Sequence, residues 1–356
     1  MTRAAFALAA ALVVTPAVAQ DEAVTLTYAT YLPQSFTWVQ VDDWFMQEVT
    51  ARTDGRVRFE TFYAASLLKA LDVIPGLSAG AADLATGAPG YNVDMLPLSS
   101  VMQPYQTNKA DAAVRAFVEL YATEPALEQE WERNNMKLLY ALAAVENTLW
   151  TDRPVTSRED LQGMRIRGTL GVAQSLELLG ATTVAMGLQD AVDGLKRGVL
   201  DGMSSMPFDI GILAGLNNVA GYVNDAGNMG VYGIVTMAVN LDVWNDLPED
   251  VQDTMHEVAS EVPDKFIEIT NKAVSDAVDA IIATEGLEVV LTTSEEDAAW
   301  KEATAQAVWD KWIADMNGRG LDGAAMMDAY VALLAKHEPN AQYRTGFDLW
   351  RERTGN

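Results

Sequence analysis

Two arginines in a strand-like segment are the side chains of this chain best suited to binding an anion. Residues 164–167 read Met-Arg-Ile-Arg and alternate apolar with cationic side chains, a period of two that is typical of a short strand. Arg165 and Arg167 therefore share one face, just before a helix-like run at residues 172–179. Open α/β sheets bind small ligands at such crossings, and a guanidinium can bind a carboxylate through two hydrogen bonds. The alternative is a surface arginine paired with an acidic side chain.

The segments before this strand indicate alternating strands and helices. Residues 24–29 and 57–62 alternate as strands, and residues 36–53 carry apolar side chains at helical spacing before Asp54-Gly55 ends the helix. The pattern Leu77-x-x-Gly80-x-x-Asp83 returns 118 residues later as Leu195-x-x-Gly198-x-x-Asp201. Such a repeat predicts βαβ units, largely parallel sheets and two similar α/β lobes that face each other across a cleft.

The later segments predict how the lobes are joined. Residues 231–239 are strand-like and are expected to cross back to the first lobe, and a helix is expected from about residue 248 to 282. At 1.5 Å per residue that helix is roughly 50 Å long, enough to span both lobes. We expect lobe I at residues 21–146 and about 232–270, and lobe II at 147–231 and about 271–315. The segment 316–356 is expected to form C-terminal helices that pack on the lobes.

The N-terminus predicts export. Residues 1–19 combine one arginine, a short apolar run and an Ala-Val-Ala end, which is typical of a secretory signal peptide cleaved after Ala19. The chain has no cysteine, so it has no disulfide, no thiolate metal site and no lipid-anchored cysteine. The formal net charge of −26 argues against nucleic acid or an anionic membrane as a partner. These features favour a protein free in the periplasm.

Several segments, in order along the chain, resemble the extracytoplasmic solute-binding proteins of TRAP transporters, of the dicarboxylate-binding-protein (DctP) type. They cover nearly all of the chain after the signal peptide and are Arg52-Thr-Asp-Gly-Arg-Val57, Leu77-Ser-Ala-Gly-Ala-Ala-Asp83, Asp160-Leu-Gln-Gly-Met-Arg-Ile-Arg167, Leu179-Gly-Ala181, Gly198-Val-Leu-Asp-Gly202 and Trp244-Asn-Asp-Leu-Pro-Glu-Asp-Val-Gln252. The resemblance implies a two-lobed, Venus-flytrap periplasmic binding protein with hinge strands. Such a protein closes on an organic anion and delivers it to the membrane permease subunits.

The resemblance also implies site residues. In the family, the arginine that ends this strand pairs with the substrate carboxylate, which is Arg167 here, and Arg165 becomes the outward charge. Where sialic-acid binders of the family have a second arginine, this chain has Asn147, and Ser205 replaces a family asparagine. These departures favour a smaller or more apolar monocarboxylate, in a pocket expected to contain Gln34, Phe36, Trp38, Tyr91, Trp150, Met206 and Phe208. For Trp38 and Trp150, packing in the core is the alternative.

An enzyme is the rival class of function. The two histidines, His256 and His337, do not have the spacing of a zinc-binding helix. Residues 318–323 match G-x-G-x-x-G but follow a helical run rather than a strand, so the dinucleotide-binding context is missing. We therefore expect no cofactor, no metal and no catalysis. A periplasmic sensor that presents its ligand to a receptor stays open as an alternative.

Overall fold

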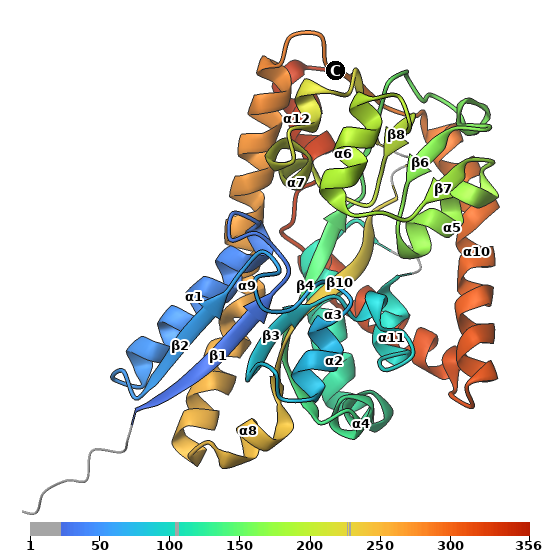
Figure 1. Ribbon diagram of the computed structural model, residues 1–356. Coiled ribbons are helices and arrows are strands. Elements are labelled where there is room, and N and C mark those ends of the chain that lie inside the picture. The colour runs from blue at the N-terminus through green and yellow to red at the C-terminus, as the bar shows by residue number, and fades with distance from the viewer. Residues whose placement is uncertain (1–22, 104–106, 226, 228) are drawn as a thin grey trace, which may run out of the picture.

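Each of the two lobes of the chain is built around one β-sheet, as the computed structural model shows (Figure 1). The structure describes residues 23–103, 107–225, 227 and 229–356. The expected signal peptide at residues 1–19 lies outside these ranges. None of the helices within them is long and apolar enough to cross a membrane.

Five strands form the first sheet, and they are β1 (Val24–Thr30), β2 (Val57–Phe62), β3 (Leu84–Gly87), β4 (Met136–Glu146) and β10 (Val231–Asn240). Their spatial order is β2-β1-β3-β10-β4. β1 is parallel to β2 and β3, whereas β10 is antiparallel to both β3 and β4. Every residue of β10 is buried, as expected for a central strand covered on both faces. The strands predicted at 24–29, 57–62 and 231–239 are confirmed.

Five helices pack beside this sheet, and they are α1 (Thr37–Arg52), α2 (Val73–Ser78), α3 (Ala110–Thr123), α4 (Pro125–Arg133) and α8 (Leu241–Asp246). The helix predicted over 36–53 is α1. Asp54 and Gly55 follow it with positive φ angles of 51° and 76°. The backbone N–H of Gly55 donates to the carbonyl of Thr50 at 2.9 Å, which satisfies one of the last carbonyl groups of the helix.

Six short strands form the second sheet, and they are β5 (Leu149–Thr151), β6 (Arg165–Arg167), β7 (Thr182–Val184), β8 (Gly202–Met203), β9 (Tyr222–Asn224) and β11 (Glu288–Val290). Their order is β11-β9-β5-β8-β6-β7, and β6 is parallel to both of its neighbours. The helices of this lobe are α5 (Leu170–Leu178), α6 (Leu188–Lys196) and α7 (Phe208–Leu213). The strand-then-helix order predicted around Arg167 is confirmed.

The repeated Gly-Asp pattern has the same structure in both lobes. Gly80 follows α2 with φ +75°, and Gly198 follows α6 with φ +67°. Asp83 then accepts a hydrogen bond of 2.7 Å from the backbone of β1, and Asp201 accepts one of 2.7 Å from the backbone of β6. The repeat therefore ends a helix and fixes an adjacent strand, once in each lobe.

Three elements join the lobes. Only Asn147 and Thr148 separate β4 from β5, and β9 leads back into β10. The long helix α9 (Glu249–Ala283) packs against α1, α3 and β4 of the first lobe and against α7 of the second. The predicted hinge strands and the predicted helix that spans both lobes are thus confirmed.

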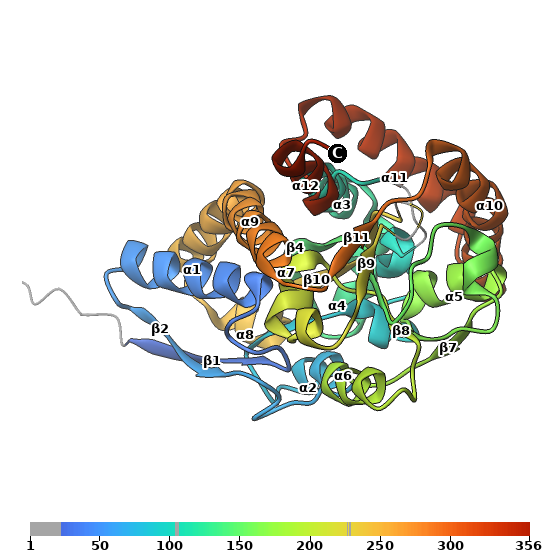
Figure 2. The same ribbon diagram turned by 90° about the horizontal axis from the view of Figure 1, so that it is seen from above.

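The C-terminal segment forms α10 (Ser294–Gly318), α11 (Gly323–His337) and α12 (Gly346–Thr354). α10 packs on α5, α11 packs on α3, and α12 packs on α9. α9 and α10 lie on opposite sides of the molecule in both views (Figures 1 and 2). The expected lobe II boundary at residue 315 falls inside α10, and the exact lobe boundaries stay a prediction.

Candidate anion-binding site between the lobes

Arg167 is a buried cation at the end of a strand of the second lobe. It is the last residue of β6, and only 7 % of it is exposed. Its Nη1 donates to the carbonyl oxygens of Ser204 at 3.0 Å and Ser205 at 3.3 Å, and its Nε donates to that of Met186 at 3.3 Å. All three partners are neutral, and within the described residues no carboxylate forms a salt bridge with it. A buried charge is costly without a counter-charge, which makes Arg167 a candidate residue for binding an anion.

Arg165 has the opposite environment. Its side chain is 47 % exposed and forms a salt bridge of 3.0 Å with Asp201. Its Nη2 also donates to the carbonyl of Gly198 at 2.9 Å. Arg165 is therefore a surface charge paired with an acid, as expected for the outward arginine, whereas Arg167 is buried.

A strained turn places the carbonyls that Arg167 contacts. Ser205 has φ +63°, in the left-handed region that costs a non-glycine residue free energy. The side chain Oδ1 of Asn147 fixes this turn by accepting from the backbone N–H of Ser205 at 2.7 Å and from the hydroxyl of Ser204 at 3.0 Å. The amide nitrogen Nδ2 of Asn147 is buried and has no partner within the described part of the chain. Asn147 thus supports Arg167 and retains an unused donor.

Tyr31 and Tyr232 both lie within the electrostatic influence of Arg167, and Tyr91 packs on Tyr31. Tyr31 and Tyr91 meet edge to face with their ring centroids 5.9 Å apart. Burial raises the pKa of Tyr31 and of Tyr232 above the usual range, and the positive charge of Arg167 opposes that increase at both hydroxyls. The sequence analysis predicted Tyr91 as a pocket residue but did not include Tyr31 or Tyr232. Tyr31 directly follows β1, so the rule that ligands bind beyond the carboxyl ends of parallel strands could have found it.

Two predicted residues of the first lobe lie near the start of α1. Gln34 is exposed, and its Nε2 donates to Asp43 Oδ2 at 3.0 Å. Phe36 packs edge to face on Trp38 with their centroids 6.4 Å apart. Trp38 itself donates through Nε1 to the carbonyl of Ala143 on β4 at 2.9 Å. Trp38 is therefore fixed against the first sheet, which agrees with the packing alternative.

The predicted apolar residues of the second lobe lie in its core. Trp150 is fully buried, and its Nε1 donates to Thr148 Oγ1 at 2.8 Å. Phe208 packs edge to face on Phe347 with their centroids 4.6 Å apart. Met206 is only 2 % exposed. The structure thus places these three side chains in the packed interior rather than in a pocket lining.

Two buried carboxyl groups lie close to the junction of the lobes. Glu146 ends β4, and burial raises its pKa to about 8. Burial also raises the pKa of Asp209 on α7, whose Oδ2 accepts a hydrogen bond from the Thr37 hydroxyl on α1. One oxygen of each carboxyl group has no partner among the described residues. The Thr37 contact directly links the first lobe to the second.

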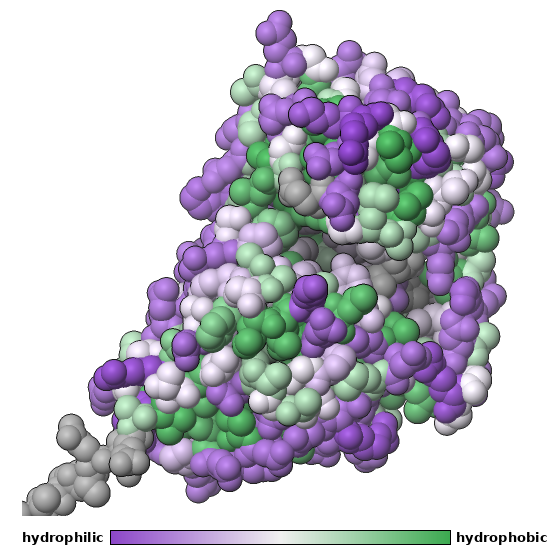
Figure 3. Space-filling view, in the orientation of Figure 1, coloured by the Kyte–Doolittle hydropathy of each residue, from purple (hydrophilic) through white to green (hydrophobic). Residues whose placement is uncertain are grey.

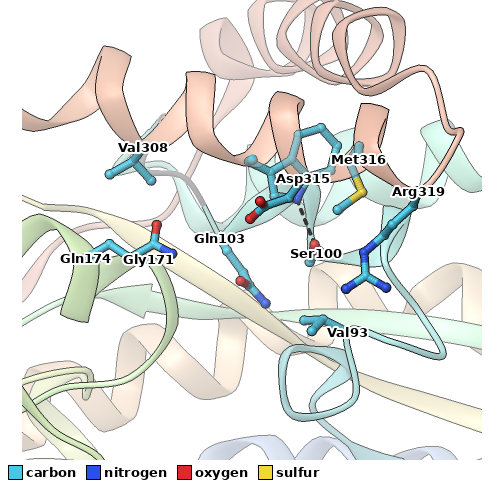
Figure 4. Close-up of a pocket in the computed structure, with 10 residues that line it drawn as sticks. Val93, Ser100, Gln103, Gly171, Gln174, Val308, Asp315, Met316 and Arg319 are labelled. Atoms are coloured by element: carbon cyan, nitrogen blue, oxygen red, sulfur yellow. Dashed lines mark hydrogen bonds between the residues drawn. The ribbon is translucent and has the colours of Figure 1, made fainter.

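A cavity of about 140 Å³ lies between the lobes beside α10 (Figure 4). Its lining includes Ser100 and Gln103 from the first lobe, Gly171 and Gln174 from α5, and Trp312 from α10. The space-filling view shows a furrow that separates the two lobes on the face seen in Figure 1 (Figure 3). The molecule therefore has a cleft between its lobes. Arg167 is the last residue of β6, and the chain continues from there into α5.

The two histidines lie in separate environments. His256 packs on Trp244, and burial lowers its pKa. His337 lies 2.8 Å from Glu119, which also pairs with Lys336. Within the described ranges no three histidine, cysteine or acidic side chains are arranged to hold a metal ion.

Comparison with known proteins identifies the family. The family model described as bacterial extracellular solute-binding protein, family 7 (DctP) matches residues 28–315. This chain belongs to that family. Members of the TRAP type bind small ligands in the periplasm, often organic acids, and work with membrane permease subunits. The two-lobed α/β fold is that of TRAP periplasmic solute-binding proteins.

Individual relatives agree with this assignment. A solute-binding protein of Roseobacter denitrificans is 28 % identical over 72 % of this chain and 78 % of its own length. A TRAP periplasmic solute-binding protein from Desulfovibrio salexigens has a TM-score of 0.76 and 26 % identity, covering 90 % of this chain and 98 % of its own. A TRAP solute-binding protein from Rhodoferax ferrireducens, in complex with copurified benzoate, has a TM-score of 0.80 and 24 % identity, covering 90 % and 100 %. Other similar structures hold orotic acid or β-D-galacturonate.

Proposed function

We propose that this family 7 protein captures a small organic acid, preferentially a monocarboxylate, and delivers it to a TRAP permease. The observation that carries the proposal is Arg167, a buried guanidinium whose partners are all neutral carbonyls. A carboxylate would supply the missing negative charge through two charge-assisted hydrogen bonds, each contributing about 1.5–3 kcal/mol. The neighbouring Asn147 is neutral, so the site favours one carboxylate over two.

The surroundings of Arg167 favour an acid with an apolar or aromatic body. Tyr31, Tyr91 and Tyr232 offer ring faces for such a body and hydroxyl groups that can reach its polar atoms. Benzoate in the Rhodoferax ferrireducens protein is a ligand of this type. After the carboxylate binds, closure of the lobes about the two crossing strands would remove the body of the ligand from water.

Delivery outside the cytoplasm requires export. We propose that residues 1–19 direct this export and are removed by cleavage after Ala19. N-terminal sequencing of the protein purified from a bacterial periplasm would then start at Gln20. A sequence that still begins at Met1 in that fraction would contradict cleavage and leave the binding site unaffected.

A thermal-shift screen of several hundred metabolites, followed by calorimetry on the hits, tests the ligand assignment. Binding to the folded state raises the melting temperature by mass action. We expect carboxylates to shift the wild-type protein, and we expect Arg167→Ala to weaken their binding at least about a hundredfold, because the carboxylate then lies in the pocket without a partner. Arg165→Ala is the matched control and should leave Kd within about threefold, because surface pairs contribute little.

Equal and small effects of the two substitutions would contradict the assignment of Arg167. Shifts caused only by neutral or cationic compounds would contradict the class of ligand. If the wild-type protein binds a carboxylate but does not support its transport when combined with the permease, this result would favour the sensory alternative.

A further inference from the structure

The cavity beside α10 holds hydrogen-bonding groups that the proposed carboxylate does not use. Three parts of the molecule line it, namely Val93, Ser100 and Gln103 of the first lobe, Gly171 and Gln174 of α5, and Val308, Trp312, Asp315, Met316 and Arg319 of α10. Figure 4 shows Gln103 from the first lobe and Gln174 from α5 on either side of the space below α10. A group bound here would contact both lobes and the C-terminal helix at once.

The side chains of this cavity that have unused hydrogen-bonding capacity are uncharged amides. Gln103 and Gln174 are half-buried, and neither side-chain amide has a hydrogen-bonding partner in the described parts of the chain. Each amide offers two donors and one acceptor. A ligand that fills the cavity would displace the water around these amides. A polar group that loses water without gaining a partner costs free energy, so a ligand that hydrogen-bonds to the amides is favoured.

The charged and indole groups of the lining already have partners. Arg319 forms a salt bridge of 2.8 Å with Asp94, and Asp315 forms one of 2.8 Å with Lys311. Trp312 donates through Nε1 to Ser100 Oγ at 2.7 Å. The cavity therefore offers amide hydrogen bonds and apolar walls rather than a free charge, which favours an uncharged polar group over a second carboxylate or an ammonium group.

The cavity has room for such a group, and one residue of its lining is near Arg167 along the chain. A volume of about 140 Å³ is roughly ten times the minimum that holds one water molecule. Gly171 lines the cavity and follows Arg167 by four residues, so their Cα atoms are at most about 14 Å apart.

We propose that the ligand of this protein carries an uncharged hydroxyl, carbonyl or amide group at the end away from its carboxylate, and that Gln103 and Gln174 bind that group. This inference rests on the proposed capture of a carboxylate by Arg167. Gln103 and Gln174 are then specificity-determining residues, because a site built to hydrogen-bond a polar group discriminates against an analogue that lacks it. The same contact joins the first lobe to the second when the ligand is bound.

Matched pairs of carboxylates test this inference by calorimetry. Each pair has the same skeleton with and without a distal hydroxyl, such as phenylacetate with 3-hydroxyphenylacetate and hexanoate with 6-hydroxyhexanoate. We expect the wild-type protein to bind the hydroxylated member of at least one pair about tenfold tighter or more. Gln103→Ala and Gln174→Ala should each bring that ratio close to one and leave Kd for the unhydroxylated member within about twofold. Gln306→Ala, at an exposed position of α10, is the matched control and should not change the ratio.

The possible results separate this inference from the function on which it rests. A ratio that Gln103→Ala and Gln174→Ala leave unchanged, with both acids still dependent on Arg167, overturns the inference and retains the carboxylate site. A second binding stoichiometry for the hydroxylated acid overturns it as well, because the cavity would then hold a separate molecule. Failure of every carboxylate to bind the folded wild-type protein contradicts the proposed function itself.

Discussion

Glu146 is a buried acid at the point where the first lobe meets the crossing segment. Its Oε1 accepts from the backbone N–H of Gly346 at 2.7 Å, and its Oε2 has no partner among the described residues. Burial, with the nearby carboxyl groups of Asp209 and Asp348, raises its pKa to about 8. The folded protein therefore keeps the Glu146 proton at neutral pH, whereas the unfolded chain releases it near the ordinary pKa of about 4.3.

The stability of the protein should fall as this proton is removed. Because the folded-state pKa lies above the unfolded-state value, the free energy of unfolding decreases as pH rises from about 4 to about 8. Glu146→Gln cannot lose a proton, and we expect it to be more stable than the wild type by up to the order of 3 kcal/mol at pH 9, with little difference at pH 4. Urea unfolding from pH 4 to 9 measures this difference.

The comparison with the wild type is needed because other buried acids titrate in the same interval. Burial raises the pKa of Glu130 to about 7 and that of Asp42 to about 6. Both proteins share those contributions, so only the difference between the two curves reports Glu146. Glu285→Gln removes an exposed acid and serves as the matched control. A flat difference for Glu146→Gln would show that Glu146 is charged in the folded protein.

The sequence pointed to one candidate anion-binding residue more clearly than to the residues around it. The alternation of residues 164–167 located Arg167, and the family resemblance separated it from Arg165. Tyr232 escaped prediction because it reaches the site from the strand that returns from the other lobe, a proximity that no local pattern shows. Trp150 and Phe208 were predicted in the pocket, and the structure places both in the core of the second lobe. Whether a large aromatic side chain faces a cleft or a core depends on tertiary packing.

Among the elements, α7 depends on a single glycine for its contact with the second sheet. A Cβ atom at Gly211 would lie 2.5 Å from the ring of Trp150. α7 also carries Asp209 and packs on α9. We expect Gly211→Ala to destabilise the protein by about 1–3 kcal/mol, because the helix must move away from a fully buried indole. It should also weaken ligand binding, since displacement of α7 disturbs the contact between Asp209 and Thr37. Denaturant unfolding and calorimetry measure the two effects.

Gly318→Ala provides the control for this prediction. Gly318 is the last residue of α10, and a Cβ atom there would meet no atom within 4 Å. Alanine forms helices better than glycine, so the substitution should be neutral or stabilising by less than about 1 kcal/mol. If Gly211→Ala were as stable as Gly318→Ala, the close packing between α7 and Trp150 would not limit the position of the helix.

The elements most fully predicted from sequence are those with strong local signals. The 35 residues of α9 repeat apolar side chains over many turns, and the Gly-Asp repeat marks a helix end and a strand start in each lobe. The sequence analysis placed most of α10 in the second lobe but did not predict that this helix also contacts the first. It packs on α5 and also bonds to Ser100 through Trp312, and such contacts between distant segments leave no periodic mark in the sequence.

The whole molecule is strongly acidic, although its proposed ligand is an anion. The full chain has a formal charge of −26, and removal of the expected signal peptide would take away one more arginine. Several cations are already paired at the surface, as in Arg52 with Glu261, Arg353 with Asp279 and Lys336 with Glu119. The mean field at a distance therefore repels a carboxylate, and the attraction of Arg167 acts only at short range inside the cleft.

Salt should therefore speed the association of an anionic ligand with this protein. Charges farther apart than the Debye length, about 10 Å at 0.1 M salt, are largely screened, whereas the buried contact with Arg167 is screened much less. For the tightest carboxylate of the screen, we expect the association rate to increase a few-fold between about 20 mM and 500 mM NaCl, with a smaller change in the dissociation rate. Stopped-flow tryptophan fluorescence measures both rates. An association rate that decreases with salt would show that a positive local field extends beyond the cleft and outweighs the net charge of the molecule.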